Sequence, residues 1–121
     1  MMRVLIVDDS PTEMHILSSL MEKLGHSVIT ANNGEEGVET AKSEKPDLVL
    51  MDVVMPGING FQATRQLHKD DTTKNIPVII VSTKDQATDK MWGARQGAKG
   101  YVTKPVEEQE LIDTIEEIFQ D

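Results

Sequence analysis

Acidic and hydroxyl side chains, together with one lysine, stand at the ends of short apolar runs in this chain. Asp8 and Asp9 end the first run, and Asp52 follows the third. Ser82 ends the fourth run, and Lys104 follows the fifth. Carboxylates brought close together repel one another, and a hard divalent cation such as Mg²⁺, bound through oxygen ligands, removes that conflict. These residue types therefore suit a magnesium site beside one nucleophilic carboxylate.

The chemistry open to such a group is the transfer of a phosphoryl group to an aspartate. A carboxylate can attack phosphorus and form an aspartyl phosphate. The metal ion, the Lys104 ammonium group and the Ser82 hydroxyl group would then neutralise the oxygens of the transferred group. Each residue taken alone is more often a turn or surface residue. Their order along the chain, each at the end of an apolar run, favours a site.

The elements that must position these residues alternate along the chain in five repeats of strand and helix. Short runs rich in Val, Ile and Leu suit strands buried on both faces. The predicted strands are Arg3–Val7, Ser27–Ala31, Leu48–Met51, Val78–Val81 and Gly100–Thr103. The alternation predicts a single α/β domain, a flavodoxin-like doubly wound fold with a parallel five-stranded sheet of order 2-1-3-4-5. Ligands of such sheets bind beyond the carboxyl ends of the strands where strand order reverses, so the side chains above should share one crevice.

Helix-start residues lie between the strands. Ser10 and Glu13 have the spacing of a capping box. Asn33, Asn59 and Asp85 are expected to cap the second, third and fourth helices. The last helix carries an apolar stripe and many glutamates, which suits one buried and one solvated face.

The fourth helix contains Trp92, the single tryptophan of the chain. Ala87, Met91 and Ala94 share one face of this helix and are expected to lie against the sheet. Trp92 would then point to solvent, where a tryptophan is a frequent anchor of protein interfaces. The alternative is that its ring lies flat on a neighbouring helix without a partner, and the sequence leaves both possibilities open.

Composition narrows the classes of function. The chain has 121 residues and a formal net charge of −9, which disfavours nucleic acid and anionic membranes as partners. No stretch approaches the roughly 20 apolar residues of a membrane span, and the N-terminal apolar run is too short for a signal peptide. The chain has no cysteine. We expect a cytoplasmic protein with one domain over residues 1–121 and no output domain.

Several segments together resemble a known family. VLIVDDSP, VLMDVVMPGINGF, PVIIVSTKD and GYVTKP are similar to the signature segments of CheY-like response-regulator receiver domains, and the likeness spans the whole chain. DDSPTEM, GFQATRQL and VSTKDQATDK resemble, more narrowly, the stand-alone PilH-like receivers of type IV pilus chemosensory systems. The resemblance implies a two-component phosphorelay protein of twitching motility, not an enzyme. A CheA-like sensor histidine kinase would phosphorylate it, and a downstream protein would read its state.

The resemblance also implies a role for each residue of the crevice. Asp52 would be the phosphoacceptor. Asp9 would bind Mg²⁺ directly, Asp8 would act mainly through a bound water, and the backbone carbonyl of Val54 would complete the coordination. Lys104 would contact Asp52 before transfer and the phosphoryl group after it.

The switch and the output surface follow from the same resemblance. Ser82 would move towards the phosphoryl group, and Tyr101, the switch aromatic, would then turn inward. The Lys104–Pro105 peptide bond is expected to be cis. The output face would be formed by the fourth helix, fifth strand and fifth helix, with Trp92, Tyr101 and Lys104 on it.

Other functions stay open at this point. The chain could be a phosphate sink or a phosphorelay carrier, in which turnover of the phosphoryl group is itself the function. A phosphatase with an aspartyl intermediate is disfavoured, because Val54 stands where a common phosphatase pattern has a second acid. A receiver that never takes a phosphoryl group is disfavoured by the full set of acids, hydroxyl and lysine. We expect a monomer or a weak dimer.

Overall fold

The structure, a computed structural model, describes residues 1–120, and in them strands and helices alternate throughout. The elements are β1 (Arg3–Val7), α1 (Pro11–Lys23), β2 (Ser27–Ala31), α2 (Gly34–Glu44), β3 (Leu48–Met51), α3 (Gly60–Lys69), β4 (Val78–Ser82), α4 (Ala87–Arg95), β5 (Gly100–Thr103) and α5 (Glu108–Ile118). All strand pairs are parallel, in the order β2-β1-β3-β4-β5. The predicted flavodoxin-like α/β fold and strand order are confirmed, and β4 extends one residue further than predicted.

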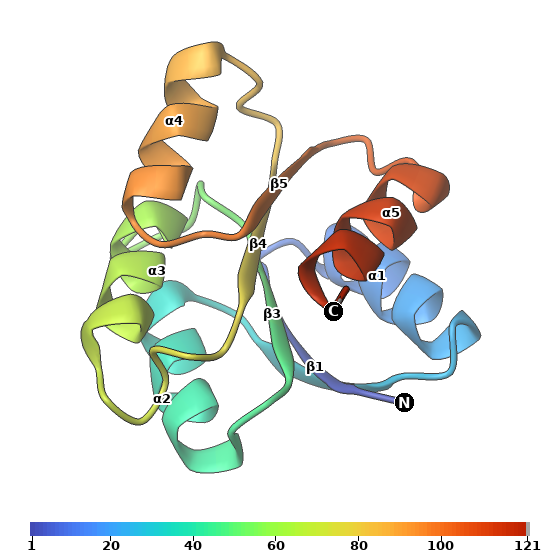
Figure 1. Cartoon of the computed structure of the whole chain (residues 1–121), viewed down its shortest axis with the longest axis horizontal. Helices are drawn as coiled ribbons and strands as arrows, with labels where there is room; N and C mark the ends of the chain where they lie inside the picture. The colour runs from blue at the N-terminus through green and yellow to red at the C-terminus, as the bar shows by residue number, and fades with distance from the viewer. Residues whose placement is uncertain (121) are drawn as a thin grey trace.

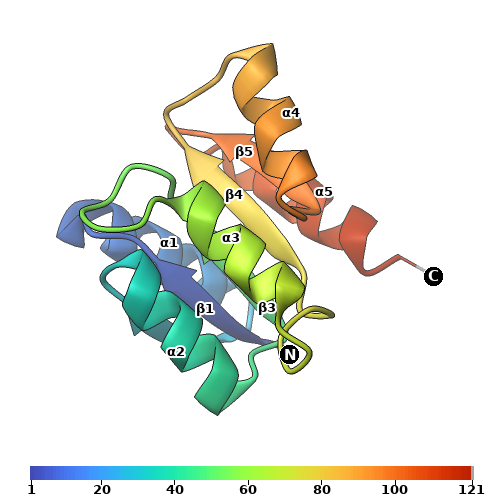
Figure 2. The same cartoon turned by 90° about the vertical axis from the view of Figure 1, so that its left-hand side faces the viewer.

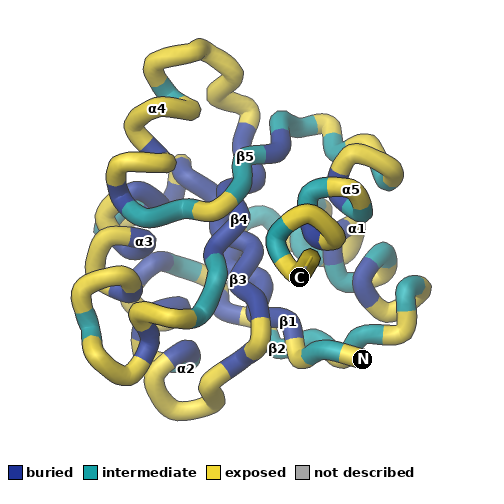
Figure 3. The backbone as a smooth tube through the Cα atoms, in the orientation of Figure 1, coloured by how far each residue is buried: buried dark blue, intermediate teal, exposed yellow. Residues whose placement is uncertain are grey.

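The helices cover both faces of the sheet (Figures 1 and 2). Helices α1 and α5 lie on one face, and α2, α3 and α4 lie on the other. Successive strand residues point to opposite faces, so Val4 and Ile6 of β1 pack with α1 and α5, while Leu5 and Val7 pack with α2 and α3. The central strands are therefore buried on both sides (Figure 3). None of the described helices is long and apolar enough to cross a bilayer.

The predicted caps of the second and third helices are confirmed. The Asn33 side chain accepts a hydrogen bond from the Glu36 N–H at 2.8 Å. Asn59 and Gln62 form a reciprocal capping box, in which each side chain accepts from the other residue's backbone N–H. These caps satisfy amide groups that would otherwise lack partners in the first helical turn.

The capping box predicted for α1 is only half formed. The Ser10 hydroxyl accepts from the Glu13 N–H at 3.3 Å. The Ser10 N–H donates instead to the Asp8 carboxylate at 2.9 Å, so the Glu13 carboxylate does not complete the box. Because the Asp8 carboxylate accepts the Ser10 N–H, the Glu13 carboxylate is available for another contact.

The start of α4 differs from the prediction. The residue that precedes the helix is Gln86, not Asp85. The Gln86 N–H donates to the Asp89 carboxylate at 3.2 Å, so the acid that serves this helix start lies inside the first turn. The expected cap at Asp85 was therefore wrong.

The buried face of α4 also differs from the prediction. Ala87, Met91 and Ala94 are exposed, and the residue that the helix buries is Gly93. A Cβ atom on Gly93 would lie 2.8 Å from the Cδ1 atom of Ile80, so the missing side chain lets the helix backbone approach β4. The α4 backbone packs closely against β4 at Gly93, and the helix has no buried apolar stripe. It therefore buries little apolar side-chain surface of its own.

Candidate functional site

The three aspartates singled out by the sequence meet at the carboxyl ends of β1 and β3. Asp8, Asp9 and Asp52 each offer a carboxylate oxygen, and these oxygens all lie within 4.8 Å of one another. Asp8 and Asp52 are buried, while Asp9 is exposed at the rim. The helix that follows β1 lies on one face of the sheet, and the helix that follows β3 lies on the other. Strand order reverses between these two strands, which is where such folds bind ligands.

Lys104, from the end of β5, reaches into the same cluster. Its Nζ atom lies 2.8 Å from Asp8 Oδ2 and 3.5 Å from Asp52 Oδ1. The Lys104 side chain is only 8% exposed, so these pairs are largely shielded from water. The peptide bond from Lys104 to Pro105 is cis, as expected. The fold has thus joined residues from three strands that are far apart in the sequence.

A fourth carboxylate, which was not expected at the site from the sequence, lies beside Lys104. Glu13 Oε2 is 3.9 Å from Lys104 Nζ. The spacing of Glu13 from Ser10 predicts a capping role, but the cap is only half formed and the Glu13 carboxylate is free to face Lys104. One sequence signal could have found it: Glu13 follows Asp9 by four residues, a spacing that places two side chains on the same side of a helix start.

The charges of the cluster are out of balance. Burial, followed by the charge of Asp8, raises the pKa of Asp52 above its ordinary 3.8, although Lys104 and the Val53 N–H lower it. Burial alone would lower the pKa of Lys104, but its hydrogen bond to Asp8 and the charge of Asp52 outweigh burial and raise it above 10.5. One ammonium group stands among several carboxylates, so the site favours a further cation with a preference for oxygen ligands. The donor set fits Mg²⁺.

The loop after β3 is held close to Asp52 by backbone contacts. The Gly60 N–H donates to the Val53 carbonyl at 2.9 Å, and a Cβ atom on Gly60 would overlap the carbonyl oxygen of Asp52. The Glu35 carboxylate accepts from the Ile58 N–H at 3.3 Å, which ties the loop to the start of α2. The Val54 side chain is 59% exposed and flanks the phosphoacceptor candidate on the solvent side.

Ser82 and Tyr101 both bind the backbone of Lys84, in the loop between β4 and α4. The buried Ser82 hydroxyl accepts from the Lys84 N–H at 3.1 Å. The Tyr101 hydroxyl donates to the Lys84 carbonyl at 2.6 Å, and its ring packs beside Phe61 and Ile80. Within residues 1–120 Ser82 makes no hydrogen bond to Asp52, so the structure joins these two residues to the same loop and not to the carboxylates.

Trp92 is half-exposed and lies beside residues of α3, apart from Tyr101. The Trp92 side chain is 49% exposed and lines a groove between α3 and α4 together with Arg65 and Gln96. Tyr101 lines a different hollow, on the other side of α4, with Lys90. The expected grouping of Trp92 on the face formed by α4, β5 and α5 was wrong. Because Gly93 faces the sheet, the helix is rotated so that Trp92 turns towards α3.

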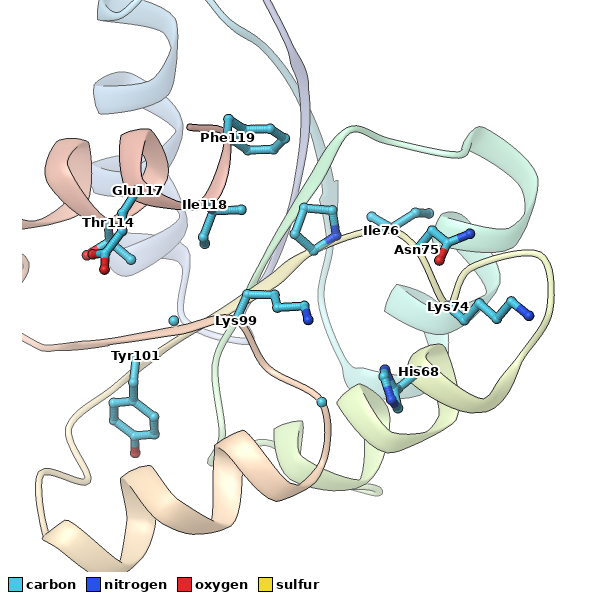
Figure 4. A pocket seen from close by; sticks show the side chains of 13 residues that line it. His68, Lys74, Asn75, Ile76, Lys99, Tyr101, Thr114, Glu117, Ile118 and Phe119 are labelled. Atoms are coloured by element: carbon cyan, nitrogen blue, oxygen red, sulfur yellow. The ribbon is translucent and has the colours of Figure 1, made fainter. Parts of the chain in front are cut away.

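A larger groove, of about 830 Å³, lies at the opposite end of the sheet (Figure 4). Pro77 and Gly100, at the amino ends of β4 and β5, line this groove, and α5 borders it. His68, Lys74 and Lys99 stand around it in Figure 4. The three carboxylates lie at the carboxyl ends of the strands, so this groove is separate from the acidic cluster.

Comparison with protein families assigns the chain. The family model described as the response regulator receiver domain matches residues 4–116. The chain belongs to the response regulator receiver family. The match covers β1 from Val4 onward, the four other strands in full and α5 as far as Glu116, so it spans nearly the whole fold.

The receiver is PilH-like. It is 64% identical over 119 residues to protein PilH of Pseudomonas aeruginosa, with 98% of each chain covered. Several other curated relatives are longer, and this receiver spans between about a quarter and a half of their length.

Solved structures agree with the fold. The chemotaxis protein CheY4 of Vibrio cholerae matches with a TM-score of 0.91 at 28% identity, covering 98% of this chain and 99% of that one. A CheY from Borrelia burgdorferi, solved in a complex with CheX, BeF3 and Mg²⁺, matches with a TM-score of 0.93 at 29% identity. That match covers 98% of this receiver and 90% of the Borrelia chain.

Proposed function

We propose that this receiver is a stand-alone response regulator that accepts a phosphoryl group on Asp52 from a CheA-like histidine kinase. The observation that carries the proposal is the position of Asp52, which lies 3.5 Å from the Lys104 ammonium group and beside Asp8 and Asp9. This arrangement offers a nucleophilic oxygen, a cation for the incoming charge and a set of metal ligands within one crevice.

Asp8, Asp9, Asp52 and the backbone carbonyl of Val54 would hold Mg²⁺. The bound ion supplies positive charge for the phosphoryl oxygens and removes the repulsion among the carboxylates. The raised pKa of Asp52 supports this assignment, because it shows that Lys104 alone does not offset burial and the charge of Asp8. The Borrelia relative, solved with Mg²⁺ and BeF3, supports it by likeness.

In the transfer step, a carboxylate oxygen of Asp52 forms a bond to phosphorus while the bond from phosphorus to the histidine nitrogen of the kinase breaks. The imidazole leaves with the electron pair of that bond, and no proton is needed from Asp52. The Lys104 ammonium group, already within 3.5 Å of Asp52, stays close to the transferred oxygens and offsets their charge.

Signal output would begin at the loop that Ser82 and Tyr101 share. The Ser82 hydroxyl would leave the Lys84 N–H to bind a phosphoryl oxygen, and Tyr101 would release the Lys84 carbonyl and turn inward. Helix α4 is suited to respond, because Gly93 is its only buried residue among those described. The face formed by α4, β5 and α5 would then present a changed surface to a downstream protein.

The likeness to PilH supports a role in a type IV pilus system that drives twitching motility. We infer that the receiver unit, which the family match places over residues 4–116, acts as a monomer or weak dimer. The unit would act in the cytoplasm, where an ATP-dependent kinase can supply the phosphoryl group. It would catalyse only its own phosphorylation and dephosphorylation.

Intact-mass measurement tests the proposal directly. The protein is incubated with Mg²⁺ and a small phosphodonor, in parallel with the Asp52→Ala variant and with a chelator. We expect one phosphoryl adduct on the wild-type protein, none on the variant, and little with the chelator. An equal adduct on Asp52→Ala would place the chemistry on another residue and refute the proposal.

A further inference from the structure

The charge of this acidic receiver is distributed very unevenly. Residues 60–104 contain eight of the twelve basic residues but only four acidic ones, which gives this segment a net charge of +4 in a chain of −9. The segment includes α3 and α4, which lie side by side on one face of the sheet (Figures 1 and 2). Lys104 belongs to the acidic crevice, but α3 and α4 themselves carry four basic residues, Arg65, Lys69, Lys90 and Arg95, and one acidic residue, Asp89. The surface that these two helices form is therefore basic on a protein that is otherwise strongly acidic.

The centre of this surface is the groove between α3 and α4, with a volume of about 350 Å³. Trp92 borders it and is 49% exposed, while Phe61 is buried below it. Amide groups of Asn59, Gln62 and Gln96 complete the lining. The groove thus combines an accessible aromatic ring with neutral donors and acceptors, a mixture typical of protein interfaces.

Two exposed arginines, Arg65 and Arg95, flank Trp92, and neither has a carboxylate partner among residues 1–120. Arg65 lines the groove, and within residues 1–120 its one side-chain hydrogen bond runs from Nη1 to Gln96 Oε1 at 3.5 Å. Arg95 follows Trp92 by three residues, so it lies one turn further along the exposed side of α4. Neither arginine has a carboxylate within 4.0 Å anywhere in residues 1–120, whereas Arg3 pairs with Glu44 at 2.8 Å.

We propose that the groove between α3 and α4 docks an acidic segment of a partner protein, with an apolar side chain on Trp92 and carboxylates on Arg65 and Arg95. A guanidinium group binds a carboxylate through two parallel hydrogen bonds, and a half-exposed tryptophan supplies apolar contact area. A nucleic acid would need a continuous row of cations, but here amides and an aromatic ring separate the two arginines.

This docking surface goes beyond the proposed output face, because it lies on the other side of α4 from Tyr101. It also does not involve Asp52, Asp8 or Lys104. The two proposals can therefore fail separately. A receiver that takes a phosphoryl group can lack the docking surface, and a receiver that docks the peptide can fail to take a phosphoryl group.

Trp92, as the only tryptophan, reports on the groove through its own fluorescence. The full chain is titrated with a short synthetic peptide that alternates glutamate with leucine, and with a matched peptide in which glutamine replaces every glutamate. We expect the acidic peptide to change the Trp92 fluorescence saturably, and added salt to weaken its binding. The glutamine peptide should bind at least about tenfold more weakly than the acidic peptide. Arg65→Gln and Arg95→Gln should each weaken binding of the acidic peptide about tenfold.

Arg3→Gln is the matched control, because it removes the same charge at a distant, paired arginine. The proposal is overturned if the acidic peptide gives no saturable change, if the glutamine peptide binds equally well, or if Arg3→Gln weakens binding as much as Arg65→Gln. Tighter binding of a short single-stranded DNA would assign the groove to nucleic acid instead. Self-association in sedimentation that Arg65→Gln abolishes would assign it to a second copy. The phosphoryl adduct of each variant is also measured by intact mass, so that a failure of docking is distinguished from a failure of phosphorylation on Asp52.

Discussion

Replacement of Lys104 by methionine tests the electrostatic reasoning most sharply. Lys104 is 8% exposed and its nearest partner, Asp8, is 1% exposed, so the variant leaves buried carboxylates without their ammonium partner. Removing one member of a buried pair typically costs about 3–5 kcal/mol, and the opening of the crevice at the exposed Asp9 favours the lower end. We expect a loss of about 3 kcal/mol in the free energy of unfolding at neutral pH.

The chain offers a matched control in Lys23. Its Nζ atom lies 2.9 Å from Glu108, almost the same distance as in the buried pair, but the two side chains are 68% and 43% exposed. An exposed pair contributes at most about 1 kcal/mol, so Lys23→Met should change stability little. The comparison separates the effect of burial from the effect of pairing.

Urea unfolding, followed by circular dichroism, measures the difference. With a slope of about 2 kcal/mol per molar urea, Lys104→Met should lower the midpoint by about 1.5 M and leave the slope unchanged. Added Mg²⁺ should recover part of the loss, because an ion that binds only the folded protein stabilises it. Equal midpoints for Lys104→Met and Lys23→Met would refute the claim that the site depends on one buried cation.

The pH dependence has a definite sign. The folded pKa of Asp52 already lies above 3.8, and loss of the Lys104 charge raises it further. A carboxyl group with a raised folded pKa stabilises the fold below its unfolded pKa, and this contribution is lost as the pH rises through the folded pKa. The gap between wild type and Lys104→Met should therefore be largest at neutral pH and shrink towards pH 3.8. Lys104, whose pKa is raised above 10.5, keeps its own contribution throughout this range.

Three further substitutions probe the site. Asp52→Asn should raise the free energy of unfolding at neutral pH, because it removes a carboxylate with a raised pKa. Urea unfolding should show that this gain disappears near pH 3.8, and a constant gain would contradict the argument. Val54→Asn should shorten the lifetime of the phosphoryl group, because an amide at this exposed position can hold an attacking water. Timed intact-mass measurement checks this, and an unchanged rate would exclude it. Gly60→Ala should cost about 1–3 kcal/mol and slow phosphorylation, since its Cβ would overlap the Asp52 carbonyl. Wild-type stability and rate for this variant would show that the loop moves freely.

The fourth helix shows why a correct element can be given the wrong face. Its apolar residues Ala87, Met91 and Ala94 suggested a buried stripe, but they are exposed. The helix is anchored by the space that Gly93 leaves for Ile80, a contact that no periodic pattern signals. The expected direction of Trp92 was derived from that face, so the sequence could not predict that it lies beside α3.

Glu13 shows the same limit inside the site. From the sequence, its spacing from Ser10 indicated a capping box. In the fold, the Asp8 carboxylate accepts the Ser10 N–H, and the Glu13 carboxylate lies 3.9 Å from Lys104. The local sequence allows the Glu13 carboxylate to cap the helix, but Lys104, from the other end of the chain, lies beside it in the fold.

The sequence by itself determined the five strands, their order and the residues at their carboxyl ends. Buried parallel strands need short apolar runs, and the rule for strand reversal then places Asp8, Asp9 and Asp52 together. Only the tertiary structure decided how far the charges of the site balance and which way α4 turns. It alone also shows that, within the described part of the chain, Arg65 and Arg95 have no carboxylate partner. The physical reason is that burial, helix rotation and charge pairing depend on atoms brought from distant parts of the chain.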